Sequence, residues 1–87
     1  MTKGKRVGEV IHFFNRISVA VLKLSQPLKV GDTVHFLGRN TDFQQQIASM
    51  EVDHESVVEG GKGSEVAVKV QQRVRRGDSI FRIEGEA

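Results

Sequence analysis

The sequence predicts a small all-β domain, an antiparallel β-barrel of about six strands that is closed or nearly closed. One observation is a phrase that occurs twice, Leu28 to Val34 and Val74 to Ile80, with a shorter copy at Gly63 to Val66. In each copy glycine supplies the positive φ of a tight turn, the next residue can hydrogen-bond the backbone, and a β-branched residue then begins a strand. The other observation is that no apolar repeat of helical period is long enough to compete. Closure is expected because it removes strand edges that template aggregation.

The first predicted strands form a hairpin. Val7 to Phe14 is joined by the Asn15-Arg16 turn to Ile17 to Leu24, which is apolar on both faces and is therefore expected to be a central strand. Pro27 interrupts the ladder because proline has no N–H to donate. Adjacent strand residues face opposite sides, so one of Phe13 and Phe14 is expected to be exposed.

The next strand, Thr33 to Leu37, is expected to turn Val34 and Phe36 inward and His35 outward. A loop is predicted over Gly38 to Asp42. Phe43 to Val52 is predicted as a further strand. Its Ile47 and Met50 fall on opposite faces of a strict alternation, which indicates a bulge or a strand covered on both sides.

The second half of the chain contains the longest predicted loop, Asp53 to Ser64. Val66, Val68 and Val70 then alternate with Ala67 and Lys69 and give the clearest strand signal. A polar connection over Gln71 to Asp78 leads to Ser79 to Ile83, where Phe81 and Ile83 are expected to face the core. The turn residues to which we assign a structural role are Gly31, Asp32, Gly63, Gly77 and Asp78.

Length and composition indicate one soluble domain. The 87 residues form a basic flexible leader at 1–6, a single domain at 7–83 and a frayed tail at 84–87. The absence of cysteine excludes disulfides and thiolate metal sites and agrees with a cytoplasmic protein. The apolar run after the leader is interrupted by Glu9 and His12, so a signal peptide and a membrane span are not expected.

Charge is distributed unevenly along the chain. Residues 1–42 hold seven Lys/Arg and three Asp/Glu, residues 43–66 hold one and five, and residues 67–87 hold five and three. A folded domain with this pattern would have a positive region that attracts polyanions, although scattered charge on a solvated surface explains it equally well.

The strand phrases resemble the β-barrel second domain of the translational GTPases, such as elongation factor Tu. The resemblance covers Val7 to Ile83 and includes Val7-Gly8-Glu9-Val10, the Leu28 to Val34 phrase and Arg76-Gly77-Asp78. The chain is more similar still to the C-terminal barrel of the collagenase-like peptidases, which include transfer RNA modification enzymes, through Thr41-Asp42-Phe43 and Met50 to Glu55. This resemblance implies the fold and a free-standing, elongation-factor-like accessory domain.

Catalytic and metal functions are not expected. Gly61-Lys62-Gly63 lacks the spacing of a phosphate-binding loop, so GTP hydrolysis is excluded. Asp53, His54 and Glu55 are adjacent and would point to alternate faces, which argues against a metal site. No motif pairs Ser18, Ser49 or Ser79 with a histidine base. We therefore predict a non-enzyme without cofactors.

Two functions stay open. The first is binding of transfer RNA or ribosomal RNA, with phosphate contacts from basic residues and base stacking on Phe13 or Phe14. The RNA-contact candidates are Arg16, Arg39, Lys69, Arg73, Arg75 and Arg76. The second is docking onto a GTPase or a transfer RNA modification enzyme without RNA, through Val57 and Val58 flanked by Glu55 and Glu59.

Overall fold

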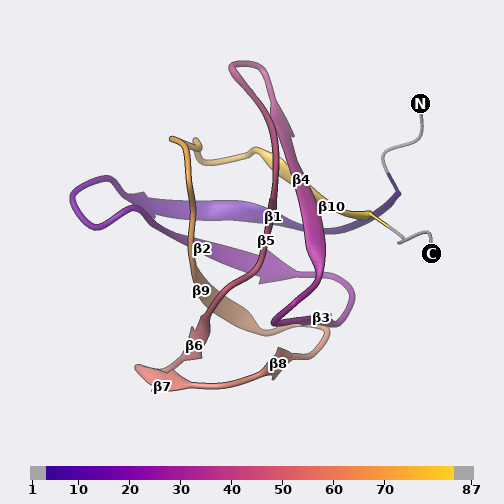
Figure 1. The fold of residues 1–87 in the computed structure, drawn as a ribbon, viewed down its shortest axis with the longest axis vertical. Coiled ribbons are helices and arrows are strands. Elements are labelled where there is room, and N and C mark those ends of the chain that lie inside the picture. Colours follow the sequence, from indigo (N-terminus) through magenta and orange to yellow (C-terminus); the bar gives the residue numbers. More distant parts are fainter. Residues whose placement is uncertain (1–3, 84–87) are drawn as a thin grey trace.

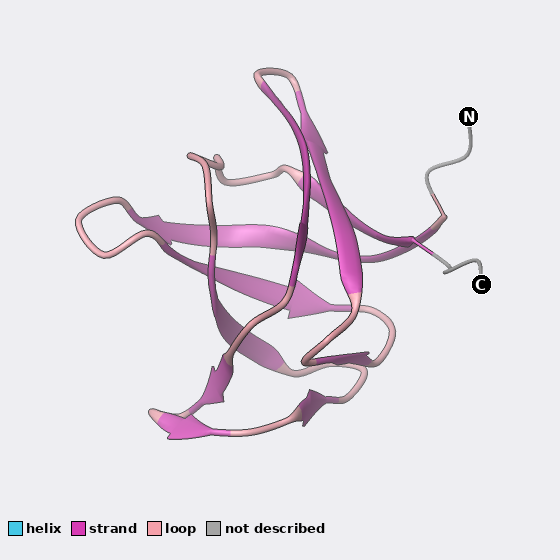
Figure 2. Ribbon diagram, viewed as in Figure 1, coloured by secondary structure: helices cyan, strands magenta, loops and turns pink. Residues whose placement is uncertain are grey.

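Residues 4–83 are described by the computed structural model, and all of them lie in strands, turns or loops (Figure 2). The predicted all-β antiparallel class is confirmed. The longer strands are β1 (Lys5–Phe14), β2 (Val19–Leu24), β4 (Thr33–Gly38), β5 (Thr41–Gln46), β9 (Glu65–Lys69) and β10 (Ser79–Ile83). The shorter strands are β3 (Leu28–Lys29), β6 (Met50–Val52), β7 (Glu55–Ser56) and β8 (Glu59–Gly60). Within the described part of the chain no helix exists that could cross a membrane.

Eight strands form one antiparallel sheet in the order β5-β4-β10-β1-β2-β9-β6-β7, while β3 pairs with β8. The sheet curls, so that β4 and β5 cross in front of β1 and β2 in Figure 1. Over residues 4–83 no backbone ladder joins β5 to the other end of the sheet. Closure is therefore incomplete at the level of backbone hydrogen bonds.

A buried glutamine joins the two sides of this opening. Gln45 of β5 is 6% exposed. Its Nε2 donates to the carbonyl oxygen of Lys69 at 2.9 Å, and the backbone N–H of Gln71 donates to its Oε1 at 2.8 Å. One side chain thus supplies a donor and an acceptor where a neighbouring strand would normally supply them.

The core lies inside the curled sheet and is filled from alternate strand positions. Val34 and Phe36 are fully buried, as predicted, and Phe36 stacks on Phe43 with ring centroids 5.0 Å apart. The predicted orientation of the last strand is wrong: Ile80 is fully buried, while Phe81 and Ile83 are only half-buried. The register explains the reversal, because Ile80 pairs with the inward Phe36 and Phe81 pairs with His35.

The three phrases that start strands form the same turn. The turns have four residues each, 29–32, 61–64 and 75–78, and the N–H of the fourth residue donates to the carbonyl of the first. The N–O distance is 3.1 Å from Asp32 to Lys29 and 3.0 Å from Asp78 to Arg75. The third residues, Gly31, Gly63 and Gly77, have φ of 99°, 87° and 95°. Such values favour glycine, which has no Cβ to clash.

The two aspartate turns share a further bond that the third turn lacks. Oδ2 of Asp32 accepts from the N–H of Lys29 at 3.0 Å, and Oδ2 of Asp78 accepts from the N–H of Arg75 at 2.8 Å. Asp78 is buried and also accepts from the hydroxyl of Thr41. This second contact fixes the β4–β5 hairpin against the turn before β10.

Several predicted boundaries are wrong in the middle of the chain. The loop predicted over Gly38 to Asp42 is only a turn at Arg39 and Asn40, because β4 and β5 pair as far as Gly38 and Thr41. The strand predicted over Phe43 to Val52 is broken at residues 47–49, which lets Ile47 and Met50 both point inward. The loop predicted over Asp53 to Ser64 contains β7 and β8.

The ends of the domain are only partly described. The predicted hairpin of β1 and β2 is present, but its turn spans residues 15–18, so β2 begins at Val19. The predicted leader at 1–6 lies partly, and the predicted tail at 84–87 wholly, outside the described residues. Lys5 pairs with Arg82, so the described ends of the chain lie side by side (Figure 1).

Gln45→Ala tests the side-chain link across the opening. We expect the free energy of unfolding to fall by roughly 1–3 kcal/mol, because the carbonyl of Lys69 and the N–H of Gln71 lose their partner. Urea unfolding measures the loss. Gln44→Ala, an exposed neighbour on the same strand, is the control and should change stability by less than about 0.5 kcal/mol. Equal effects of the two substitutions would contradict the link.

Gly38→Ala tests the packing of the buried aspartate. A Cβ at Gly38 would lie 1.9 Å from Oδ1 of Asp78, whose carboxylate is held by Thr41 and Arg75. We expect a destabilisation of about 1–3 kcal/mol in thermal unfolding. Gly61→Ala is the matched control, since nothing lies within 4 Å of its Cβ position. A neutral Gly38→Ala variant would show that the aspartate is not fixed.

Candidate functional site

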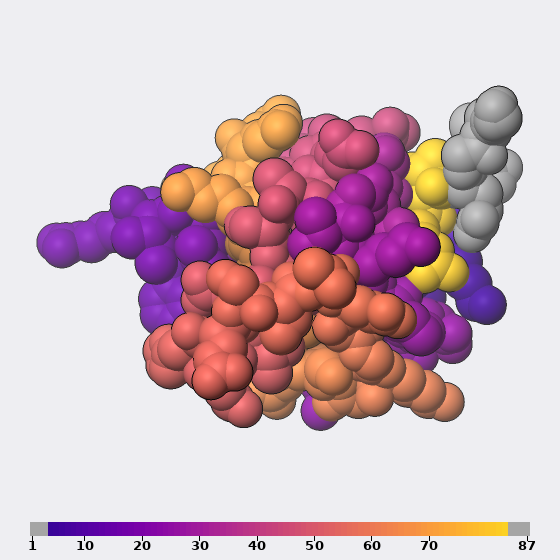
Figure 3. Space-filling view, turned by 60° about the horizontal axis from the view of Figure 1, so that its bottom comes forward, coloured from indigo at the N-terminus to yellow at the C-terminus, as the bar shows by residue number. Residues whose placement is uncertain are grey.

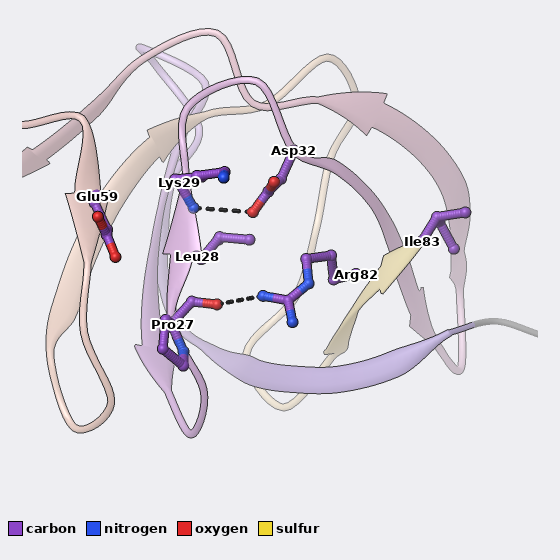
Figure 4. Close-up of a pocket in the computed structure, with 7 residues that line it drawn as sticks. All are labelled: Pro27, Leu28, Lys29, Asp32, Glu59, Arg82 and Ile83. Atoms are coloured by element: carbon purple, nitrogen blue, oxygen red, sulfur yellow. Dashed lines mark hydrogen bonds between the residues drawn. The ribbon is translucent and has the colours of Figure 1, made fainter. Parts of the chain in front are cut away.

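The surface has a polar groove between β3, the turn before β4, and the end of β10 (Figure 4). Its volume is about 390 Å³. It is lined by Pro27, Leu28, Lys29, Asp32, Glu59, Arg82 and Ile83. Cations and carboxylates alternate around it, so the groove has no dominant charge.

The polar groups of this groove hold the fold together. Nη1 of Arg82 donates to the carbonyl of Pro27 at 2.6 Å, across the gap between β10 and the start of β3. Asp32 accepts from the backbone of Lys29 in the turn described above. Figure 4 shows these two bonds close together, with Leu28 between them. The polar groove is therefore a structural junction.

A second groove, which we call the apolar groove, lies between two hairpins. Its volume is about 520 Å³, within the range of ligand sites in proteins. One wall is the β1–β2 hairpin, whose Phe14 and Ile17 are 46% and 57% exposed. The turn of this hairpin projects from the body of the molecule in Figure 3. The groove is lined by Phe14, Ile17, Val19, Ser49, Glu51, His54, Ala67, Val68 and Lys69.

The residues predicted to contact RNA are all exposed and fall into two groups. Arg16 lies in the β1–β2 turn, and Lys69 lies near it because the N–H of Val70 donates to the carbonyl of Ser18 at 2.9 Å. Arg39 lies in the β4–β5 turn, which Asp78 ties to the turn containing Arg75 and Arg76. Arg73 lies between the two groups in the chain.

The residues predicted to dock a protein partner differ in exposure. Val57 is half-buried against the core, whereas Val58 is 76% exposed. Glu55 is exposed on β7, and Glu59 lines the polar groove. Docking through these residues stays a prediction.

The histidines lie apart from one another. His12 packs on Phe14 with ring centroids 4.2 Å apart, and Nε2 of His35 lies 2.6 Å from Oδ1 of Asp42. His54 lies in the β6–β7 turn. Within residues 4–83 no three histidine or carboxylate side chains are placed to hold a metal ion.

Comparison with known proteins identifies two relatives by sequence and one domain with a similar fold. No family profile matches the chain. It is 36% identical over 76 residues to an uncharacterized protease of Methanocaldococcus jannaschii, a match that covers 86% of this chain and 19% of that protein. It is 28% identical over 80 residues to a collagenase of Porphyromonas gingivalis, covering 90% of this chain and 19% of that protein. The chain thus spans about a fifth of the length of the curated relatives it matches.

The fold matches an isolated domain of a peptidase. The structure superposes on the C-terminal domain of a Geobacillus thermoleovorans protein assigned to the U32 peptidases with a TM-score of 0.86 and 17% identity. The match covers 97% of this chain and 98% of that domain. The selenomethionine form of the same domain gives a TM-score of 0.85. At this identity the likeness shows the fold.

These findings correct the predicted function. The resemblance to collagenase-like peptidases is supported, since the relatives are named a protease and a collagenase. The prediction of a translation-factor accessory domain that binds RNA is wrong, because the homologues are peptidases. The shared turn and strand phrases specify a barrel-like fold and do not specify its function. The predicted protein partners and cytoplasmic location stay predictions.

Sequence reasoning missed two features of these surfaces. Ile17 was placed in a strand, although it lies in the turn and forms part of the apolar groove. The buried position and the bonds of Gln45 were not predicted either. Its signal was available, because a strict alternation from Phe43 to Ile47 puts Gln45 at an inward position, where an amide needs partners.

Arg82→Met tests the structural role of the polar groove. Loss of the bond to the carbonyl of Pro27 should lower the free energy of unfolding by about 1–2 kcal/mol. Arg73→Met, at an exposed position on the β9–β10 connection, is the control and should be close to neutral. Chemical denaturation of both variants gives the comparison. An Arg82→Met variant as stable as the control would contradict this role.

Proposed function

We propose that this chain is a non-catalytic accessory domain of a collagenase-like, U32-type peptidase. One observation supports this most directly: sequence similarity covers 86% of the chain but only 19% of the protease from Methanocaldococcus jannaschii. The similar region has the size of a single domain. The match to 98% of a C-terminal domain from a protein assigned to the U32 peptidases agrees with this interpretation.

The polar side chains of the described residues support a role without catalysis. Within residues 4–83 no hydrogen bond joins a hydroxyl group to a histidine, and the sequence has no cysteine to act as a nucleophile. Thr41 donates to Asp78, and Oγ of Ser79 accepts from Nε of Arg6 at 3.1 Å. These hydroxyls therefore serve the fold.

The first test is direct. The purified chain, incubated with heat-denatured collagen, should release no new amino termini above a buffer control. The reason is that it offers no activated nucleophile and no metal cluster in its described part. Peptide-bond cleavage that persists after repeated purification, and that scales with the amount of chain, would contradict the proposal.

The second test concerns the accessory role. The matching segment of the Porphyromonas gingivalis collagenase can be deleted, or replaced by this chain. We expect the deletion to lose cleavage of denatured collagen and the replacement to recover part of it, because the chain has the fold of such a domain. A replacement no more active than the deletion, although folded by circular dichroism, would count against the accessory role.

A further inference from the structure

The outer face of the sheet changes from charged to apolar along β1, β2 and β9. One row of paired residues, away from the β1–β2 turn, consists of Glu9, Lys23 and Glu65. Nζ of Lys23 is 3.9 Å from Oε2 of Glu65. Such a row is expected on a solvated face. The next rows toward the hairpin turn contain His12, Val21 and Ala67, then Phe14, Val19 and Lys69.

Four residues of these two rows are apolar and yet face away from the core: Phe14, Val19, Val21 and Ala67. The inward neighbours on β2 and β9 include Ala20 and Val66, which are fully buried, so the core is already filled from the other face. The outer-face valines are half-buried, and Phe14 is 46% exposed. Exposed apolar surface gathered in a groove is a mark of a binding site.

Defined turns border the groove on both sides. Ser18, Asp53 and His54 have φ of 55°, 52° and 67°, and they are the non-glycine residues with positive φ in the described part of the chain. Ser18 adjoins Ile17 and Val19 on one wall of the apolar groove, and His54 lines the other wall. Asp53 and His54 are the two residues between the paired Val52 and Glu55, and a two-residue hairpin turn favours positive φ at both, so this turn fixes where His54 lies.

The two walls of the groove differ in chemistry. The hairpin wall is apolar, while the facing wall presents hydrogen-bonding groups from Ser49, Glu51 and His54. An apolar pocket with a few polar groups at its rim fits a large apolar side chain on a polypeptide backbone, whose amides need hydrogen-bond partners.

The position of the groove indicates which polypeptide would bind. Lys5, at the start of β1, pairs with Arg82, whereas Phe14, at the far end of β1, lines the groove. Ten residues of strand separate these ends by roughly 30 Å. In a C-terminal domain the rest of the protein precedes β1. The groove would therefore lie at the far end of β1 from the point where the preceding domain is attached.

We propose that the apolar groove docks an extended segment of the peptidase's protein substrate, with an aromatic or branched aliphatic side chain between Ile17 and His54. This inference rests on the proposed function and names the ligand class of that domain. The contact is small, so binding is weak and serves to hold an unfolded polypeptide near a catalytic domain.

NMR titration of the isotope-labelled chain tests the proposal. The probes are a synthetic Gly/Ser peptide with one central Phe and the same peptide with Ala in its place. We expect saturable amide shifts at Ile17, Val19, His54 and Ala67 with the Phe peptide and none with the Ala peptide. Phe14→Ser and Ile17→Ser should each weaken binding by about tenfold, which corresponds to about 1.4 kcal/mol.

Val58→Ser is the matched control, because Val58 is 76% exposed and does not line the groove. It should leave the affinity unchanged. The proposal is overturned by equal shifts with both peptides, by an affinity that survives both groove substitutions, or by groove shifts that depend on protein concentration without peptide, which would indicate a second copy. A chain that restores the collagenase replacement but binds no peptide would refute the groove and leave the accessory role standing.

Discussion

The amide of Gln45 bridges an opening in the curled sheet that no backbone ladder spans within residues 4–83. β5 ends one side of the sheet, and the last residues of β9 lie opposite it. Because the amide offers both a donor and an acceptor, it satisfies Lys69 and Gln71 together and is itself satisfied. Within residues 4–83 no buried side-chain nitrogen or oxygen lacks a partner. The few buried polar side chains are thus hydrogen-bonded, and the rest of the core is apolar.

The hydrogen bonds at this opening also hold the β1–β2 hairpin that forms one wall of the apolar groove. The bond from Gln45 holds Lys69, and the next residue, Val70, bonds Ser18 in the β1–β2 turn. The projecting hairpin is thus tied to the sheet opening through two successive residues. On the opposite side, β6 and β7 form a short hairpin whose two turn residues, Asp53 and His54, have positive φ. The apolar groove lies between these two fixed hairpins, and it needs no movement of the fold to be open.

The sequence predicted the elements whose signal is local. Alternation identified β4 and β9, and the repeated Gly-Asp phrase identified the turns before β4 and β10, because the bonds of those turns lie within four residues. Features that depend on distant residues were not predicted. Ile80 faces inward because of its register with Phe36, and the function of Gln45 depends on Lys69 and Gln71. The groove joins residues from both halves of the chain, and the relatives do not support the likeness to translation factors, because phrases that specify turns do not specify a function.

A crystal structure of the chain with the Phe-containing peptide would test the central claim most directly, since that claim places a polypeptide in the groove between the β1–β2 and β6–β7 hairpins. The account predicts the phenyl ring between Ile17 and His54, with the peptide backbone toward Ser49 and Glu51 and with Ser18, Asp53 and His54 still at positive φ. A peptide bound elsewhere, or hairpin turns that relax to negative φ when the peptide binds, would contradict it.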